Sequence, residues 1–163
     1  MQNNINADDA LIALQNFAEQ AANASSPENV FELAESITRL FIGHNLFTVM
    51  VFDSGRMEVQ RCYTSDPKNY PVGGRKKKRD TAWGHHVLLQ GNPIIGHGEE
   101  NIRSFFDDHE VISGLGLCSV INIPIKKLGK VVGTMNLLDT TPHYTTNDIK
   151  LGTLITLALS TAL

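Results

Sequence analysis

Histidine and cysteine are the side chains of this sequence best suited to metal binding or nucleophilic chemistry. Six histidines occur, and two of them, His85 and His86, are adjacent. Adjacent residues of a helix point to different sides, so this pair cannot chelate an ion as residues four apart would. The two cysteines, Cys62 and Cys118, are too few for a cysteine zinc site or a disulfide framework. We therefore expect no metal site, and expect a histidine to line a pocket as a hydrogen-bonding group.

Carboxylates and hydroxyls form no recognisable catalytic pattern. The sequence has no nucleophile elbow and no glycine-rich phosphate loop. Asp107 and Asp108, beside His109, have the chemistry of acid–base groups, but an exposed polar helix end explains them equally well. The sequence therefore favours a binding protein over an enzyme.

Basic residues are concentrated in one run, Arg75 to Arg79. The formal net charge is −3 and no aromatic residues are interleaved with the run, so nucleic acid is not an expected partner. Two readings remain: a solvated loop, or a mobile lid that draws an anion into a pocket. Arg61 also has two readings, because a strand arginine either extends its head to solvent or is buried against a carboxylate or an anionic ligand.

Hydrophobic periodicity predicts the elements that position these residues. Helical spacing marks both ends of the chain, where Ser26 and the cluster 145–148 are good N-caps, and Asp80 is a possible cap for a short central helix. Consecutive hairpins imply an antiparallel sheet, so the fold class is α+β. The predicted helices are 8–23, 27–41, 81–90, 99–109 and 145–163, the predicted strands are 46–52, 57–64, 93–96, 117–126 and 130–138, and residues 65–80 form a long loop.

The last hairpin gives the clearest prediction of a site. A three-residue loop at 127–129 implies these pairs: Lys126/Lys130, Ile125/Val131, Ile123/Gly133, Asn122/Thr134 and Val120/Asn136. One face is then almost wholly apolar and suits covering helices. The other face carries Asn122, Thr134 and Asn136, and suits either a pocket wall that orients a small ligand or a half-solvated surface. A register slip of one residue would exchange the faces.

Two stretches of the second half, SVINIPIKKLGKVVGTMNLLD and HYTTNDIKLGTLITLAL, carry a recognisable spacing. The matching positions, in order, are Ser119, Pro124, Ile125, Gly129, Gly133, Leu137, Tyr144 and Asp148. In this spacing the chain resembles a GAF domain, and the resemblance covers essentially all of residues 1–163 as one domain. It implies a central antiparallel sheet of about six strands, with N- and C-terminal helices on one face and a ligand pocket on the other. The pocket residues that it implies are Trp83, His85, His86, Asp107, Asp108, Ser119, Asn122, Thr134 and Asn136.

The resemblance implies a small-molecule-binding sensory or regulatory domain that dimerises through its terminal helices, with a small polar or anionic metabolite as ligand and no identified cofactor. Members that bind cyclic nucleotides carry a pattern of which 105–108 echoes only the end, and the attachment cysteine of bilin-binding members does not fit Cys118. One alternative is a redox enzyme similar to free methionine sulfoxide reductase, with Cys118 as nucleophile and Cys62 resolving it. Another is a ligand-free structural dimerisation module.

The sequence also bears on where the protein works. No apolar run approaches the roughly 20 residues that span a bilayer. The N-terminus, Met1 to Asp9, is polar and acidic and shows no secretory signal. We therefore expect a soluble, cytoplasmic protein with no membrane partner.

Overall fold

A six-stranded antiparallel sheet forms the middle layer of the structure, a computed structural model that describes residues 6–78 and 81–163. The strands are β1 (Leu46–Asp53), β2 (Glu58–Thr64), β3 (Arg75–Lys77), β4 (Ile94–His97), β5 (Ser119–Lys127) and β6 (Lys130–Asp139). Their order across the sheet is β3-β2-β1-β6-β5-β4. The expected α+β class and the sheet of six strands are confirmed.

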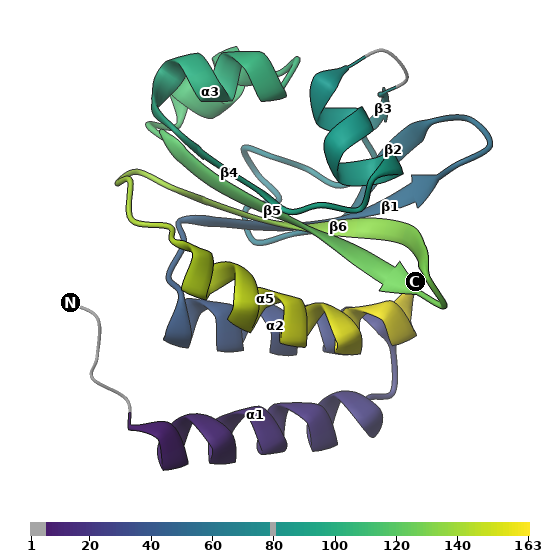
Figure 1. The fold of residues 1–163 in the computed structure, drawn as a ribbon, viewed down its shortest axis with the longest axis vertical. Helices are drawn as coiled ribbons and strands as arrows, with labels where there is room; N and C mark the ends of the chain where they lie inside the picture. Colours follow the sequence, from purple (N-terminus) through teal and green to yellow (C-terminus); the bar gives the residue numbers. More distant parts are fainter. Residues whose placement is uncertain (1–5, 79–80) are drawn as a thin grey trace.

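Helices from the two ends of the chain lie together on one face of this sheet (Figure 1). They are α1 (Ala7–Ala22), α2 (Pro27–Phe41) and α5 (Thr146–Leu159), followed by the short η2 (Ser160–Ala162). Local sequence sets where they begin, because Ser26 accepts a hydrogen bond from the backbone of Asn29, and Thr145 forms a capping box with Asp148. Helices α2 and α5 pack on the sheet, and α1 packs outside them, mainly on α2.

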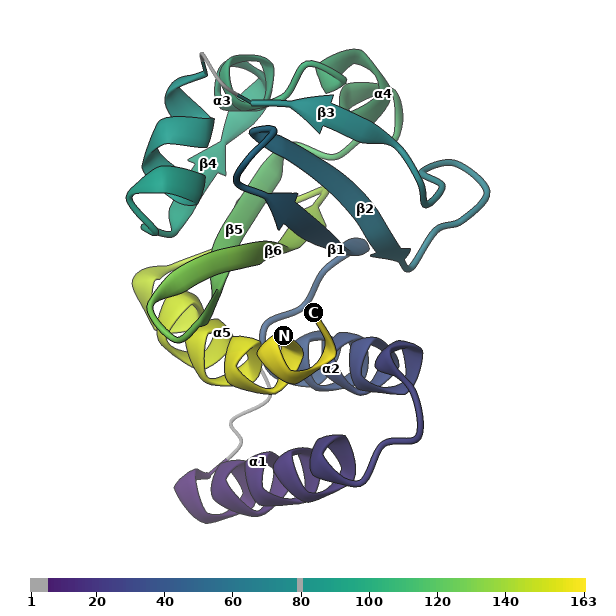
Figure 2. The same ribbon diagram turned by 90° about the vertical axis from the view of Figure 1, so that its right-hand side faces the viewer.

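The opposite face is covered by three short helices, which we call the roof (Figures 1 and 2). They are η1 (Gly84–Leu89), a π-helical turn, α3 (Gly98–Phe105) and α4 (His109–Gly114). The short helix predicted over 81–90 is confirmed, whereas the helix predicted over 99–109 ends at Phe105, and a separate helix, α4, begins at His109. The loop predicted over 65–80 is wrong in part, because it contains β3, an edge strand that pairs with β2. Arg79 and Asp80, the end of the basic run and the expected cap, lie outside the described residues.

The last hairpin departs from its predicted register, but the residues beyond its bulge keep their predicted faces. Its turn has two residues, Leu128 and Gly129, with φ of 51° and 81°, because Lys127 pairs with Lys130. Val132 then has no partner in β5, and this bulge displaces the pairs by one more residue. The structure therefore replaces the predicted pairs by these: Lys126/Val131, Ile125/Gly133, Ile123/Met135, Asn122/Asn136 and Val120/Leu138. Because the displacement totals two residues, each residue from Gly133 onward keeps its predicted face, whereas Val131 and Val132 exchange faces.

The first hairpin contains a bulge that the sequence did not indicate. Its turn has four residues, 54–57. Val49 pairs with Tyr63 but Met50 pairs with Arg61, which leaves Cys62 as the extra residue. Strict alternation would place Arg61 and Tyr63 on one face, and the bulge places them on opposite faces. Tyr63 packs in the helix-side core, and Arg61 points to the roof, where it contacts Asp108.

The helix-facing side of the sheet is built from rows of apolar side chains. Across β1, β6 and β5 these rows are Phe47–Leu137–Ile121, Val49–Met135–Ile123 and Val51–Gly133–Ile125. They form one continuous core with α2 and α5. Among the described residues, none of the helices combines the length and hydrophobicity that crossing a bilayer requires.

Candidate functional site

A row of polar side chains crosses the roof-facing side of the same strands. Thr48 of β1 pairs with Asn136 of β6, which pairs with Asn122 of β5, and we call these three the amide row. The Asn136 amide donates to the Thr48 hydroxyl at 3.1 Å, and the Asn122 amide donates to the Asn136 side-chain oxygen at 2.7 Å. The indole N–H of Trp83 donates to the Asn122 oxygen at 2.9 Å. All four side chains are buried, so the amide row faces an enclosed interior rather than bulk water.

The amide row divides the roof side into two apolar clusters. On one side of it lies the row Leu46–Leu138–Val120, which packs under α3 and α4. On the other side lie Met50 and its partner Thr134, and Met50 packs with Trp83 and η1. The hydroxyl of Thr134 is buried and has no hydrogen-bond partner among the described residues. A polar seam thus runs through what would otherwise be a second apolar core.

Close backbone packing at η1 holds Trp83 over the amide row. A Cβ at Gly84 would lie 2.3 Å from the carbonyl oxygen of Lys78, so only glycine allows this approach. The Thr81 hydroxyl accepts from the backbone N–H of Gly84 at 2.9 Å. The ammonium group of Lys78 lies 5.4 Å from the centre of the Trp83 ring. The indole therefore occupies the space directly above Asn122.

Beside the seam lies a group of buried cations, Arg61, Lys76 and Lys78, which we call the cationic cluster. Lys76 and Lys78 come from the basic run, and the alternation of β3 turns Lys76 inward while its two neighbours in β3 stay exposed. Lys76 donates to the carboxylate of Asp108 at 2.5 Å, and Lys78 pairs with Asp107 at 3.2 Å. Burial of cations is costly unless acceptors compensate, so the cluster needs these roof carboxylates.

Arg61 is buried against an aromatic ring on the roof side. Only 6 % of its surface is exposed, and its guanidinium stacks 3.5 Å above the ring centre of Tyr70. It donates to the carbonyl oxygen of Pro71 at 2.6 Å and lies 3.8 Å from Asp108. Its Nε–H and the Oδ1 atom of Asp108 are buried without partners among the described residues. The reading of Arg61 as a solvent-extended side chain is therefore wrong.

Burial and ionic or hydrogen-bonded partners act together on the pKa values of Asp108, Lys76 and Tyr70. Burial alone would raise the pKa of Asp108, but hydrogen bonds from Lys76 and Tyr70 outweigh it and the pKa lies below its ordinary value. Burial lowers the pKa of Lys76 in spite of the pairing with Asp108. Burial, together with the charge of Asp108, raises the pKa of Tyr70. Asp108 is therefore an ionised acceptor and Tyr70 a neutral donor at neutral pH.

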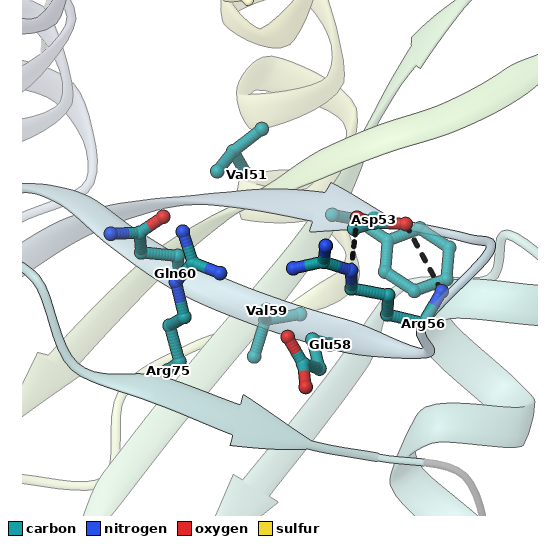
Figure 3. A pocket seen from close by; sticks show the side chains of 8 residues that line it. Val51, Asp53, Arg56, Glu58, Val59, Gln60 and Arg75 are labelled. Carbon is teal, nitrogen blue, oxygen red and sulfur yellow. Dashed lines mark hydrogen bonds and ion pairs between the residues drawn. The ribbon is translucent and has the colours of Figure 1, made fainter.

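A surface hollow lies away from this seam, at the first hairpin (Figure 3). It has a volume of about 320 Å³ and is lined by Val51, Phe52, Asp53, Arg56, Glu58, Val59, Gln60 and Arg75. Arg56 pairs with Asp53 at the turn of this hairpin, and Arg75 comes from the edge strand β3. The lining contains none of the residues predicted for the site.

The model of the GAF domain family matches residues 32–163 of this sequence. The chain belongs to the GAF domain family. The match begins inside α2, so α1 lies outside it. Among curated proteins, no relative of the sequence was found.

Solved GAF domains share the fold at low sequence identity. The GAF domain from a phosphoenolpyruvate-protein phosphotransferase of Coxiella burnetii is 16% identical, covers 97% of this chain and 94% of its own, and has a TM-score of 0.78. The GAF domain of a two-component sensor histidine kinase from Bacillus halodurans is 16% identical, with coverages of 85% and 94% and a TM-score of 0.70. Free methionine-R-sulfoxide reductase from Neisseria meningitidis is 12% identical, with coverages of 97% and 92% and a TM-score of 0.73.

The residues that the GAF resemblance implied fall into three groups. Trp83, Asn122 and Asn136 are joined by hydrogen bonds, and Thr134 lies in the next row of the sheet. Asp107 and Asp108 meet the cationic cluster. The other three lie outside the seam: His85 is exposed, His86 bonds the carbonyl oxygen of Pro93, and Ser119 bonds the backbone at Thr141 on the helix-facing side.

Sequence reasoning did not include Thr48 or Tyr70 in the candidate site, and it named Lys76 and Lys78 only as part of the basic run 75–79. The available signal was the alternation within the basic run, which turns every second cation inward once the run is a strand. Nothing in the sequence marked Tyr70 as the platform beneath Arg61. The pairing of Arg61 with a carboxylate was one of its predicted readings.

The two thiols of this GAF domain lie far apart. Cys62 is in β2 and Cys118 directly precedes β5, and two strands separate β2 from β5. Three strand spacings of about 4.8 Å give roughly 14 Å, whereas a disulfide needs Cα atoms within about 7 Å. Burial raises the pKa of the Cys62 thiol to about 11, which disfavours the reactive thiolate. Among the described residues, no group of three His, Cys, Asp or Glu side chains is arranged to hold a metal ion.

Proposed function

We propose that this GAF domain is a sensory module that binds a small polar or anionic molecule between the sheet and the roof. The observation that carries the proposal is a set of buried polar atoms without partners among the described residues: Nε of Arg61, Oδ1 of Asp108 and Oγ1 of Thr134. Native proteins leave few such atoms unsatisfied, because each costs about 1–3 kcal/mol. A bound ligand would supply the missing partners.

Entry of a ligand to the amide row requires Trp83 to move, because the indole occupies that space. The polar group of the ligand would then replace the indole N–H as the partner of Asn122. Binding would therefore displace η1, and the free energy of binding must exceed the cost of that displacement.

The signal would pass through the sheet to the terminal helices. Gly152 of α5 packs so closely that a Cβ there would lie 2.2 Å from Cδ1 of Ile123. Ile123 follows Asn122 in β5 and points to the other face. A shift of β5 at the site is thus carried directly to α5.

Thermal stabilisation by a panel of polar and anionic metabolites tests this function on the full chain. A ligand that binds the folded state raises the Tm, and the stabilisation grows with the logarithm of the ligand concentration divided by its Kd. The Thr134→Val variant removes one of the unpartnered atoms while keeping the shape, so it should weaken the stabilisation by the best ligand. Thr161→Val, on η2, is the matched control and should leave it unchanged. Equal binding by both variants contradicts this location.

We also propose that the domain is a homodimer through its terminal helices. The support is a set of exposed apolar side chains on α1, α2 and α5, which are Leu11, Ile12, Leu40, Leu154 and Leu157. Light scattering should give twice the chain mass, and Leu157→Glu should give the monomer mass. Leu128→Glu, at the 98 % exposed hairpin tip, is the control and should stay dimeric. A monomeric wild type, or a dimeric Leu157→Glu variant, contradicts this interface.

A further inference from the structure

Three donor groups surround one of the two side-chain oxygen atoms of Asp108. Its Oδ2 accepts from Lys76 and from the Tyr70 hydroxyl, each at 2.5 Å, and lies 3.8 Å from Arg61. Its Oδ1 is buried without a partner among the described residues. Asp108 therefore satisfies the cationic cluster only in part, although the donors around it suit a carboxylate.

Arg61 shows which contact is missing. Its Nη1 donates to Pro71, and only Nη2 faces Asp108, at a distance too long for a good hydrogen bond. Nε lies on the same edge of the guanidinium as Nη2 and has no partner among the described residues. A carboxylate normally binds such an edge through two parallel hydrogen bonds. The Nε–Nη2 edge is thus a carboxylate site that Asp108 only approaches.

Asp108 is placed where it can leave without dismantling the fold. It lies between α3 and α4, and its side chain makes no capping hydrogen bond to α4. Phe106 and Ile112 are buried on either side of it and anchor this part of the roof. Rotation of the Asp108 side chain alone would therefore expose Arg61 and Lys76 to another acceptor.

We propose that the cationic cluster binds the carboxylate group of a small organic acid, and that Asp108 occupies this place as an internal substitute in the ligand-free protein. This inference rests on the proposed function and names the chemical class of its ligand. The carboxylate of the ligand exchanges with that of Asp108 and binds both Nε and Nη2 of Arg61. Asp108 then no longer pairs with Lys76 of β3, so binding alters the roof near α4 (Figure 2).

The test removes the substitute and measures binding of simple anions by calorimetry and thermal unfolding. Asp108→Asn should lower the Tm without ligand, because Arg61 and Lys76 lose the carboxylate with which they pair. Sodium succinate should restore it and should bind about tenfold more tightly than to wild type, the equivalent of about 1.4 kcal/mol. Sodium chloride at equal ionic strength should not restore the Tm. Asp53→Asn is the matched control, because Asp53 is exposed and pairs with Arg56 of its own turn, outside the cationic cluster.

A second variant keeps the test decisive if Asp108→Asn does not fold. Tyr70→Phe removes one hydrogen bond that holds Asp108 and leaves every charge in place. It should bind succinate severalfold more tightly than wild type, and adding Arg61→Gln should abolish that gain. Unchanged affinity in the variants that fold overturns the inference, and so does equal rescue by chloride.

The remaining outcomes separate the ligand class from the function. Sodium phosphate binding more tightly than succinate to Asp108→Asn overturns the assignment to a carboxylate. If wild type binds a metabolite but removal of Asp108 leaves its affinity unchanged, the proposed function stands and this inference fails. If no metabolite binds wild type but Asp108→Asn binds succinate, the carboxylate site stands and the proposed sensory function fails.

Discussion

The two faces of one sheet are constructed on opposite principles. Towards the helices, each row across β1, β6 and β5 is apolar, and a single core joins the sheet to α2 and α5. Towards the roof, the amide row and the cationic cluster separate two smaller apolar clusters. Neighbouring residues of one strand, such as Asn136 and Leu137, serve the two faces alternately. Apolar packing thus dominates the helix side, whereas the roof side depends on buried hydrogen bonds and ion pairs as well.

The largest effect is expected on the helix side. Leu137→Ala deletes a fully buried side chain from the centre of the core and should reduce the free energy of unfolding by about 3 kcal/mol. Chemical denaturation measures this change. Leu157→Ala is the control, because Leu157 is 64 % exposed and its loss should cost less than about 0.5 kcal/mol in a monomeric sample. Equal losses would contradict the contrast between core and surface.

A smaller loss is expected in the amide row. Asn122→Ala removes the acceptor of the Trp83 indole and the donor to Asn136, so it should reduce the free energy of unfolding by about 2 kcal/mol. Trp83 is the only tryptophan, so its fluorescence should shift in the folded variant. Unchanged fluorescence would show that the indole does not depend on Asn122. Asn147→Ala, on the exposed start of α5, should change neither quantity.

The pH dependence of stability near neutrality should come from His44, on the helix side. Burial lowers the pKa of His44 from 6.5 to about 4, so below pH 6.5 the unfolded chain binds a proton that the folded chain rejects. The stability is complete above pH 6.5 and falls as the pH drops towards 4. Between pH 7.5 and 5.5 the loss should be about 1 kcal/mol. Denaturation at both values measures it, and an equally steep dependence in His44→Asn would refute the assignment.

The smallest effect should have the opposite sign. Thr134→Val replaces a buried hydroxyl that has no partner among the described residues by a methyl group of similar size. In the ligand-free protein this should be neutral or stabilising by up to about 0.5 kcal/mol, because no hydrogen bond is lost. Thr48→Val, which removes a partner of Asn136, should be destabilising instead. A loss above about 1 kcal/mol in Thr134→Val would show that its hydroxyl is already satisfied.

The fold was predictable because its signals are local. Alternation identified both hairpins, and helix caps such as Ser26 identified where helices begin. The register of the last hairpin was not predictable, because a two-residue turn and a bulge at Val132 depend on backbone geometry rather than on residue type. The residues from Gly133 onward keep their predicted faces only because the turn and the bulge together displace the pairs by two residues. The bulge at Cys62 had no such compensation, and it separated Arg61 from Tyr63.

The site was predictable only where it follows from strand alternation. Asn122, Thr134 and Asn136 share a face because of their spacing, and this needs no tertiary information. The cationic cluster needs the pairing of β3 with β2, which a run of lysines does not indicate. Its contact with Asp108 joins segments that are distant in the sequence, and no local pattern encodes it.

The unpaired residue of β6 also determines how the chain tolerates changes in length. Removing Val132 would erase the bulge and leave every later residue opposite its present partner. Losing any one residue between Gly133 and Leu138 would instead move part of the strand out of phase, bringing amides to the helices and leucines to the roof. An evolving lineage can therefore delete one residue at the bulge of this hairpin, but within the paired part of the strand it must delete two.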